Sequence, residues 1–66
     1  MRLQVNGAQR DVPDAGTLAE VMAELDAPDR GIAVALDGEV VPRAHWEGTT
    51  VADGASVEIV TAVQGG

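Results

Sequence analysis

The sequence closes with Ser56-Val57-Glu58-Ile59-Val60-Thr61-Ala62-Val63-Gln64-Gly65-Gly66. β-Branched residues dominate the first part of this stretch, which predicts a strand, and two glycines follow the strand in place of a turn into another element. Because glycine has no Cβ atom, a diglycine end can enter a narrow channel in backbone conformations that other residues avoid. We therefore expect residues 63–66 to form a flexible tail that carries the function. A frayed end without a role is the plain alternative.

Length and composition restrict the classes of function. A chain of 66 residues buries only about 60% of its unfolded surface, so we expect one domain over residues 1–66 without a deep catalytic cavity of its own. Eleven acidic residues stand against four basic ones, for a net charge of −7. This excludes a binder of nucleic-acid phosphates and favours a partner with a basic surface.

Cysteine is absent from the sequence, which excludes a disulfide framework, a thiolate zinc site and a nucleophilic thiol. The amino-terminal residues alternate in polarity at once, so we expect no signal peptide, and no apolar run reaches the length of a membrane span. These features together favour a cytoplasmic protein that binds neither nucleic acid nor a membrane.

The first segment predicts a β-hairpin. Leu3 and Val5 alternate with polar neighbours, as in a strand with one buried face, and Asn6-Gly7 is a strong signal for a two-residue turn. A second strand is expected over residues 9–12, and it should end at Pro13 because proline cannot donate to a ladder.

A helix should follow the hairpin. Thr17-Leu18-Ala19-Glu20 has the pattern of a capping box, and Pro28 disfavours helix at the residue before it. Residues at helical spacing form one apolar stripe, which consists of Leu18, Val21, Met22 and Leu25. The helix is short, so it needs to pack this stripe on a sheet to be stable.

The second half of the chain predicts three more strands. Residues 32–36 alternate large and small side chains, and Asp37-Gly38 turns the chain into a brief strand over residues 39–41. Residues 42–46 break the pattern and predict an irregular or single-turn segment. We expect Trp46 to cover the edge of a thin core, and His45 to be a surface residue without a metal. Asp53-Gly54 then leads into the last strand.

The predicted fold class is therefore α+β, with the order ββαβββ and one main helix across one face of a mixed sheet. Alternation along the last strand directs Val57 and Ile59 toward the helix, together with Leu3, Val5, Val34 and Leu36. Glu58, Val60 and Ala62 should point away from it. These three residues are a candidate face for docking a partner.

No set of side chains in the sequence has a catalytic pattern. Serine, histidine and carboxylate residues do not occur at the spacing of a triad, and a phosphate-binding glycine loop is absent. The remaining reactive group is the carboxylate of Gly66, which is ionised at neutral pH and can attack an activated phosphate. Any sulfur that this chain carried would have to sit on that carboxyl group as a thiocarboxylate.

Motifs along nearly the whole chain resemble the small ubiquitin-like sulfur carriers, and among them most closely the ThiS family of thiamin biosynthesis. The resemblance rests on their order and spacing: Leu3-Gln4-Val5-Asn6-Gly7, Thr17-Leu18, residues 34–43 followed by Trp46, Asp53-Gly54, Val57-Glu58-Ile59-Val60 and Ala62-Val63-Gln64-Gly65-Gly66. It implies a β-grasp fold whose first and last strands lie side by side and parallel in the middle of the sheet.

The resemblance also implies a reaction sequence. A ThiF-type adenylating enzyme would use ATP and magnesium to form an acyl adenylate on Gly66, and a persulfide from a cysteine desulfurase would convert it into a thiocarboxylate. Thiazole synthase, of the ThiG type, would take this sulfur to build the thiazole of thiamin. Gly66 would be the acceptor, while Gly65, Gln64 and Val63 would thread into the partner. The chain itself would be a protein co-substrate that binds no cofactor.

Two other readings stay open. The small subunit of molybdopterin synthase shares the fold and the diglycine end, although that family tends to be longer and richer in phenylalanine, which this sequence lacks. A β-grasp interaction module with an inert tail is the alternative of another class. Conjugation to lysines of other proteins is a further alternative.

Overall fold

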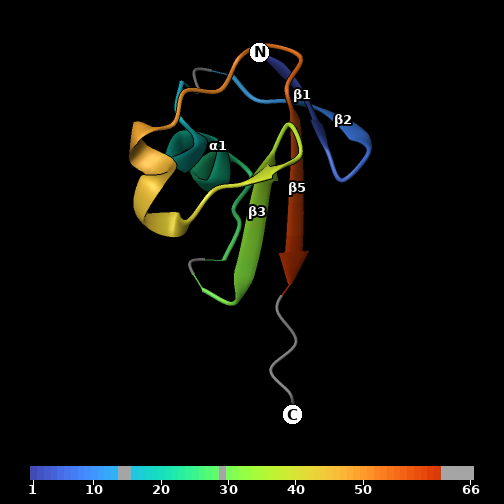
Figure 1. The fold of residues 1–66 in the computed structure, drawn as a ribbon. Coiled ribbons are helices and arrows are strands. Elements are labelled where there is room, and N and C mark those ends of the chain that lie inside the picture. The colour runs from blue at the N-terminus through green and yellow to red at the C-terminus, as the bar shows by residue number, and fades with distance from the viewer. Residues whose placement is uncertain (14–15, 29, 62–66) are drawn as a thin grey trace.

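The structure is a computed structural model that describes residues 1–13, 16–28 and 30–61. The elements follow the order β1 (Arg2–Val5), β2 (Ala8–Asp11), α1 (Leu18–Glu24), β3 (Ile32–Leu36), β4 (Glu39–Val40), the 3₁₀ helix η1 (Arg43–Gly48) and β5 (Ser56–Thr61). The strands form one sheet of order β2-β1-β5-β3-β4, and α1 lies against one of its faces (Figure 1). The expected α+β architecture is confirmed.

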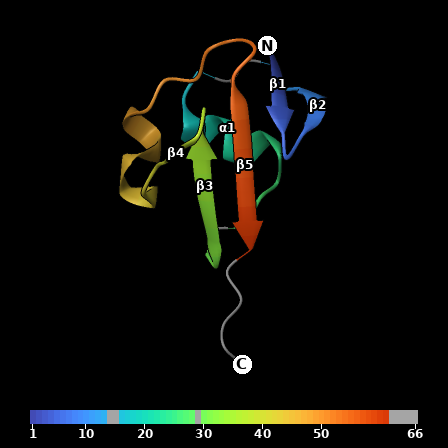
Figure 2. The ribbon, with the colours of Figure 1, turned by 45° about the vertical axis from the view of Figure 1, so that its right-hand side comes forward.

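The pairing of the strands makes the sheet mixed. β1 and β5 are parallel, with Gln4 opposite Ser56 and Val5 opposite Val57, whereas the β1–β2, β3–β4 and β3–β5 pairs are antiparallel. The first and last strands therefore lie side by side inside the sheet, as the resemblance implied, and β5 is its central strand (Figure 2).

Both hairpins close on two residues with positive φ. Asn6 and Gly7 have φ of 51° and 82°, and Asp37 and Gly38 have φ of 51° and 87°. Asparagine, aspartate and glycine tolerate this region best, and such turns match the twist of the strands that they join. The sequence prediction of the two turns is confirmed.

The second strand is one residue earlier than expected. The turn at residues 6–7 pairs Val5 with Ala8, so β2 covers Ala8–Asp11 and excludes Val12. Val12 directly follows the strand, and its side chain lies in the core, where it is 1% exposed. The backbone N–H of Val12 donates to the carbonyl of Met1 over 2.8 Å.

The helix begins with the predicted capping box. The hydroxyl of Thr17 accepts the backbone N–H of Glu20 over 3.3 Å, and the carboxylate of Glu20 accepts the backbone N–H of Thr17 over 3.0 Å and that of Gly16 over 2.8 Å. Leu18, Val21 and Met22 are buried, but Leu25 is the C-cap residue and is only half-buried. Leu25 still packs against the core, so all four residues of the predicted stripe lie on it.

The core lies between the sheet and α1, and η1 closes one side of it. Trp46, on η1, is buried, and its indole Nε1 donates to the carbonyl of Val41 over 2.9 Å. This confirms that Trp46 covers the edge of the core. Leu36 and Ile59 are partly buried against the core, while Val12, Val51 and Ala55 belong to it although the sequence pattern did not mark them.

Candidate functional site

The site predicted from the sequence follows directly on the central strand. β5 ends at Thr61, which lies opposite Ile32, the first residue of β3. The predicted acceptor Gly66 and the threading residues Gly65, Gln64 and Val63 lie outside the described residues, as does Ala62 of the predicted docking face. The described part of the site is therefore the strand that presents this segment.

Side-chain hydrogen bonds fix β5 at several points along its length. The carboxylate of Asp37 accepts the backbone N–H of Ser56 over 2.9 Å, and the side-chain carbonyl of Asn6 accepts the backbone N–H of Ile59 over 2.7 Å. In addition, the carbonyl of Ser56 accepts the backbone N–H of Asp37 over 2.7 Å. Turn residues of both hairpins thus fix the position of β5 in the sheet.

The face of the sheet opposite α1 carries an exposed apolar patch. Val60 is 62% exposed and Glu58 is exposed, which confirms the direction predicted for both side chains. Val40 on β4 is 67% exposed and joins them. Val40 lies opposite Ala35, which in turn lies opposite Glu58, while Val60 lies opposite Ala33. We call Val40, Ala33, Ala35, Glu58 and Val60 the open-face patch.

The sequence analysis placed Val40 in a strand but missed its part in this patch. A two-residue turn at Asp37-Gly38 fixes the register of the hairpin, so Val40 pairs with Ala35 and shares its face. Because Val34 points to the core, its neighbour Ala35 and therefore Val40 point away from it. The turn signal together with alternation could have identified this residue.

No group of three or more His, Cys, Asp or Glu among the described residues could hold a metal ion. Hydrogen bonds from the backbone of Gly16, and then of Thr17, lower the pKa of the Glu20 carboxyl, which capping of α1 explains. His45 is exposed on η1. No helix in the described part of the chain is long and apolar enough to cross a membrane.

A shallow cavity of about 240 Å³ lies between α1 and η1. Ala19, Met22 and Ala23 of α1 line one side, and Arg43, Trp46 and Glu47 of η1 line the other. The guanidinium carbon of Arg43 lies 6.0 Å from the centre of the Trp46 ring, within the range of a cation–π contact. The cavity is formed on the helix side of the molecule, away from the open-face patch.

Comparison with known proteins identifies the family of this chain. The model of the ThiS family matches residues 3–66. The chain belongs to the ThiS family. The match includes the diglycine end and confirms the family that the order and spacing of the motifs indicated.

Relatives of known structure agree with this assignment. The crystal structure of the thiamine biosynthesis protein ThiS from Geobacter metallireducens has a TM-score of 0.84 and 35% identity, with full coverage of both chains. An NMR solution structure of a thiamine biosynthesis protein from the same organism has a TM-score of 0.77, with 100% of this chain and 88% of the other covered. The β-grasp fold of ThiS proteins is thereby confirmed.

Two curated relatives differ in length. The sulfur carrier protein ThiS of Escherichia coli strain K12 is 27% identical, and the alignment covers all of both chains. A thiazole synthase of Paramagnetospirillum magneticum is 33% identical over 66 residues, which are the whole of this chain but only 20% of that protein. The chain thus spans about a fifth of the length of this second relative.

Proposed function

We propose that this member of the ThiS family carries sulfur on the carboxyl group of Gly66 for the formation of the thiazole of thiamin. The observation that carries the proposal is the family match, which extends through the diglycine to residue 66. The family match identifies the chain as a sulfur carrier of thiamin biosynthesis. The chemistry at Gly66 and the identity of the partners are what we propose in addition.

The chemistry begins with activation of the carboxylate. One oxygen of Gly66 attacks the α-phosphorus of ATP on an adenylating enzyme of the ThiF type, which holds the magnesium, and pyrophosphate leaves. The terminal sulfur of a persulfide then attacks the acyl carbon and displaces AMP, which gives an acyl disulfide. A second thiol attacks the donor's cysteine sulfur, forms a disulfide with it and releases the thiocarboxylate. A cysteine desulfurase is the proposed origin of the persulfide. The chain supplies the acyl group and is a substrate of these enzymes.

The second partner is a thiazole synthase of the ThiG type, which would accept the sulfur. A segment similar to this chain occurs within the thiazole synthase of Paramagnetospirillum magneticum. Linking a carrier to its acceptor in one chain raises their effective concentration, so such an arrangement is expected where the two act together. This supports thiazole synthase as the acceptor for the present chain.

Two features support a carrier that is acted on by two enzymes. Residues 62–66 follow the last residue of β5, and five residues span at most roughly 17 Å when extended. They could reach a buried site while the sheet and helix stay outside it. The open-face patch, which includes Val60 near the end of β5, is an exposed surface that each partner would contact.

Adenylation is tested by pyrophosphate release from ATP with the adenylating enzyme of the same genome. We expect release to depend on this chain and to be lost when Gly66 is deleted, with thermal unfolding unchanged. Pyrophosphate release that persists after the deletion would refute Gly66 as the acceptor. Release without later sulfur transfer to thiazole synthase, but with transfer to a molybdopterin precursor, would favour the molybdopterin-synthase alternative.

A further inference from the structure

β5 extends beyond the strand that pairs with one of its edges. β1 ends at Val5, which lies opposite Val57, whereas β5 continues to Thr61. Figures 1 and 2 both show the second half of β5 beside β3 on one side and past the end of β1 on the other. The central strand of the sheet therefore has an open edge along its last residues.

The hydrogen bonds show which groups face this open edge. The backbone N–H of Asp37 donates to the carbonyl of Ser56, so the residue pair 37–56 is hydrogen-bonded, and such pairs alternate along an antiparallel ladder. Residues 58 and 60 thus bond to β3, while residues 57, 59 and 61 direct their N–H and C=O groups to the side of β1. The backbone N–H of Asn6 indeed donates to the carbonyl of Val57 over 2.9 Å.

Asn6 makes the last contact on that side. Its side-chain carbonyl accepts the N–H of Ile59, in the place where a further residue of β1 would accept it. Among the described residues, nothing pairs with the carbonyl of Ile59 or the N–H of Thr61. Within the described part of the chain, the carbonyl of Ile59 and the N–H of Thr61 therefore stay unpaired, one acceptor and one donor at adjacent positions along the edge of β5.

This edge lacks the features that usually block strand pairing. Edge strands are commonly protected by charged residues or proline. The outer edge at β2 carries Arg10 and Asp11, and β4, at the other edge, has only two residues. Residues 59–61 of β5 read Ile-Val-Thr and include neither a charge nor a proline, and Val60 is 62% exposed.

We infer that an extended backbone segment of thiazole synthase pairs with the free edge of β5 at Ile59 and Thr61 and so continues the ladder that β1 leaves. The inference rests on the proposed function. Backbone pairing of this kind supplies affinity through main-chain hydrogen bonds, while neighbouring side chains supply specificity. Here the neighbouring side chains are those of the open-face patch, which includes Val60. The added strand would fix the direction in which the tail enters the synthase.

The experiment compares Thr61→Pro with Thr61→Ala in binding to thiazole synthase of the same genome. Both substitutions remove the threonine side chain. Proline also fixes φ and removes the N–H that faces the free edge, and it is tolerated at edge positions, whereas alanine keeps the N–H. We expect both variants to unfold as the wild type does. Loss of one bond that leaves a buried acceptor unpaired should weaken binding of Thr61→Pro about tenfold relative to Thr61→Ala. Amide hydrogen exchange at Thr61 should slow when unlabelled synthase is added to the wild type.

The outcomes separate this inference from the proposed function. Equal affinity of the two variants, or unchanged exchange at Thr61 in a wild-type complex that still transfers sulfur, would overturn the inference and leave the function standing. Protection of Thr61 that rises with the concentration of this chain alone would mean that a second copy occupies the edge, which also overturns it. A wild-type chain that neither binds the synthase nor transfers sulfur would refute both.

Discussion

Asn6 has two structural roles that depend on different parts of the residue. Its backbone adopts φ of 51° in the first turn of the chain, and its side chain reaches β5 to accept the N–H of Ile59 over 2.7 Å. The sequence predicts the first role, because Asn-Gly is a turn signal. The second role could not be predicted, since it joins residues 53 positions apart that come together only after β1 and β5 have paired.

The side-chain role of Asn6 can be isolated by substitution. Asn6→Gly keeps the positive φ and removes the side-chain acceptor, so we expect the free energy of unfolding to fall by about 0.5–1.5 kcal/mol. Asn6→Asp keeps an acceptor oxygen and tolerates the same φ, and it serves as the control with little loss. Urea denaturation of the three proteins measures the difference. Equal stability of Asn6→Gly and the wild type would show that the bond to Ile59 does not hold the strand.

Glu20 connects stability to pH. Hydrogen bonds from the backbone of Gly16 and Thr17 lower the pKa of its carboxyl from the ordinary value of 4.5. A lowered pKa means that the ionised form stabilises the fold above the unfolded pKa, and that this stabilisation is lost as the pH falls through the folded pKa. We expect Glu20→Gln to be less stable than the wild type at neutral pH and to lose less stability between neutral pH and pH values below 4.5.

Denaturant titrations at several pH values check this prediction. Glu24→Gln removes the same charge from the exposed side of α1 and is the matched control. An acid sensitivity of Glu20→Gln identical to that of the wild type, with Glu24→Gln also unchanged, would contradict a stabilising role of the Glu20 carboxylate.

At the scale of elements, the helix shows where the apolar pattern is sufficient and where it is not. The capping box correctly predicted the start of α1. Helical spacing, however, predicted the same burial for Leu25 as for Leu18. In the structure α1 ends at Glu24, so Leu25 is only half-buried while Leu18 is fully buried. Periodicity cannot show that the last member of a stripe falls on the cap residue, because the end of a short helix depends on what it packs against.

These positions should differ in their effect on stability. Leu18→Ala leaves a cavity at a site with 0% exposure and should lower the free energy of unfolding by about 2–5 kcal/mol. Leu25→Ala removes a half-buried side chain and should cost clearly less. Thermal and urea unfolding of the two variants give the comparison. A larger loss in Leu25→Ala would mean that α1 packs through its C-terminal turn.

The strands were predicted well because turn signals fixed their limits. Asn6-Gly7 and Asp37-Gly38 are both turns with two positive φ values, and the strands on either side follow in register. The core residues outside the strands could not be predicted in this way. Val12 directly follows β2, while Val51 and Ala55 lie between η1 and β5, and all three are buried.

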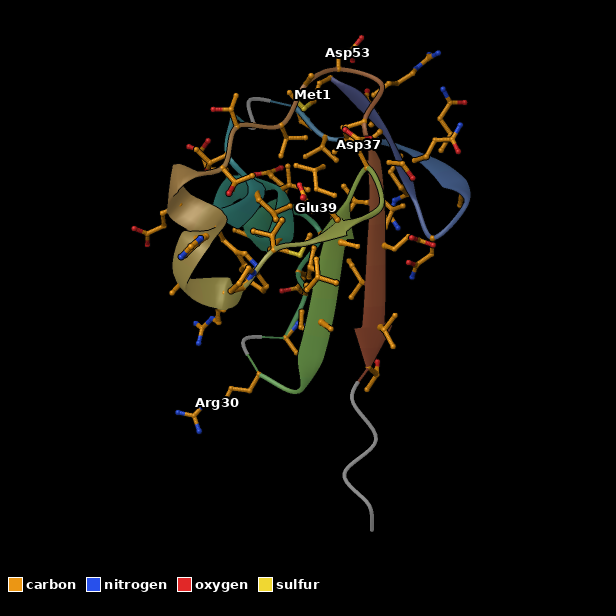
Figure 3. The ribbon with its side chains drawn as sticks, viewed as in Figure 1. Met1, Arg30, Asp37, Glu39 and Asp53 are labelled. Carbon is orange, nitrogen blue, oxygen red and sulfur yellow. The ribbon has the colours of Figure 1, made fainter. Side chains whose placement is uncertain are left out.

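At the scale of the whole molecule, the two ends of the sheet differ in their charged groups. Figure 3 shows Asp37 and Asp53 at the end where β5 begins, near Met1, and Arg30 at the opposite end, where β5 finishes. The carboxylate of Asp53 accepts the backbone N–H of Arg2 over 2.6 Å. Asp37 and Asp53 thus accept backbone hydrogen bonds at the end of the sheet opposite the last residue of β5. The net charge of −7 still favours partners with basic surfaces.

The open-face patch should matter for binding and not for folding. We expect Val60→Arg to weaken binding to the adenylating enzyme at least about tenfold, because it places a charge in an apolar contact. Its unfolding should stay unchanged, since Val60 is 62% exposed. Gln9→Arg adds the same charge to an exposed residue of β2 on the same face and is the control. Equal affinity of both variants, measured by calorimetry, would remove the patch from the interface.

The candidate site was predictable in part. The proposed chemistry at Gly66 was predicted from the diglycine motif and the resemblance, and alternation along β5 placed Glu58 and Val60 on the open face. The contribution of Val40 depends on the register between β3, β4 and β5, and the free edge at Thr61 depends on where β1 stops relative to β5. Such relations between distant segments arise from topology, which local patterns do not specify.

The central claim is that Gly66 carries sulfur as a thiocarboxylate. Intact mass spectrometry tests it most directly, after incubation of the chain with its adenylating enzyme, ATP, magnesium, a cysteine desulfurase and cysteine. We predict a product heavier by the difference between one sulfur and one oxygen atom, which reverts when thiazole synthase and its substrates are added and which does not form when Gly66 is deleted. An unchanged mass of the full chain under conditions in which the enzymes act on a known ThiS protein, or an added mass on a lysine of another protein, would contradict the account.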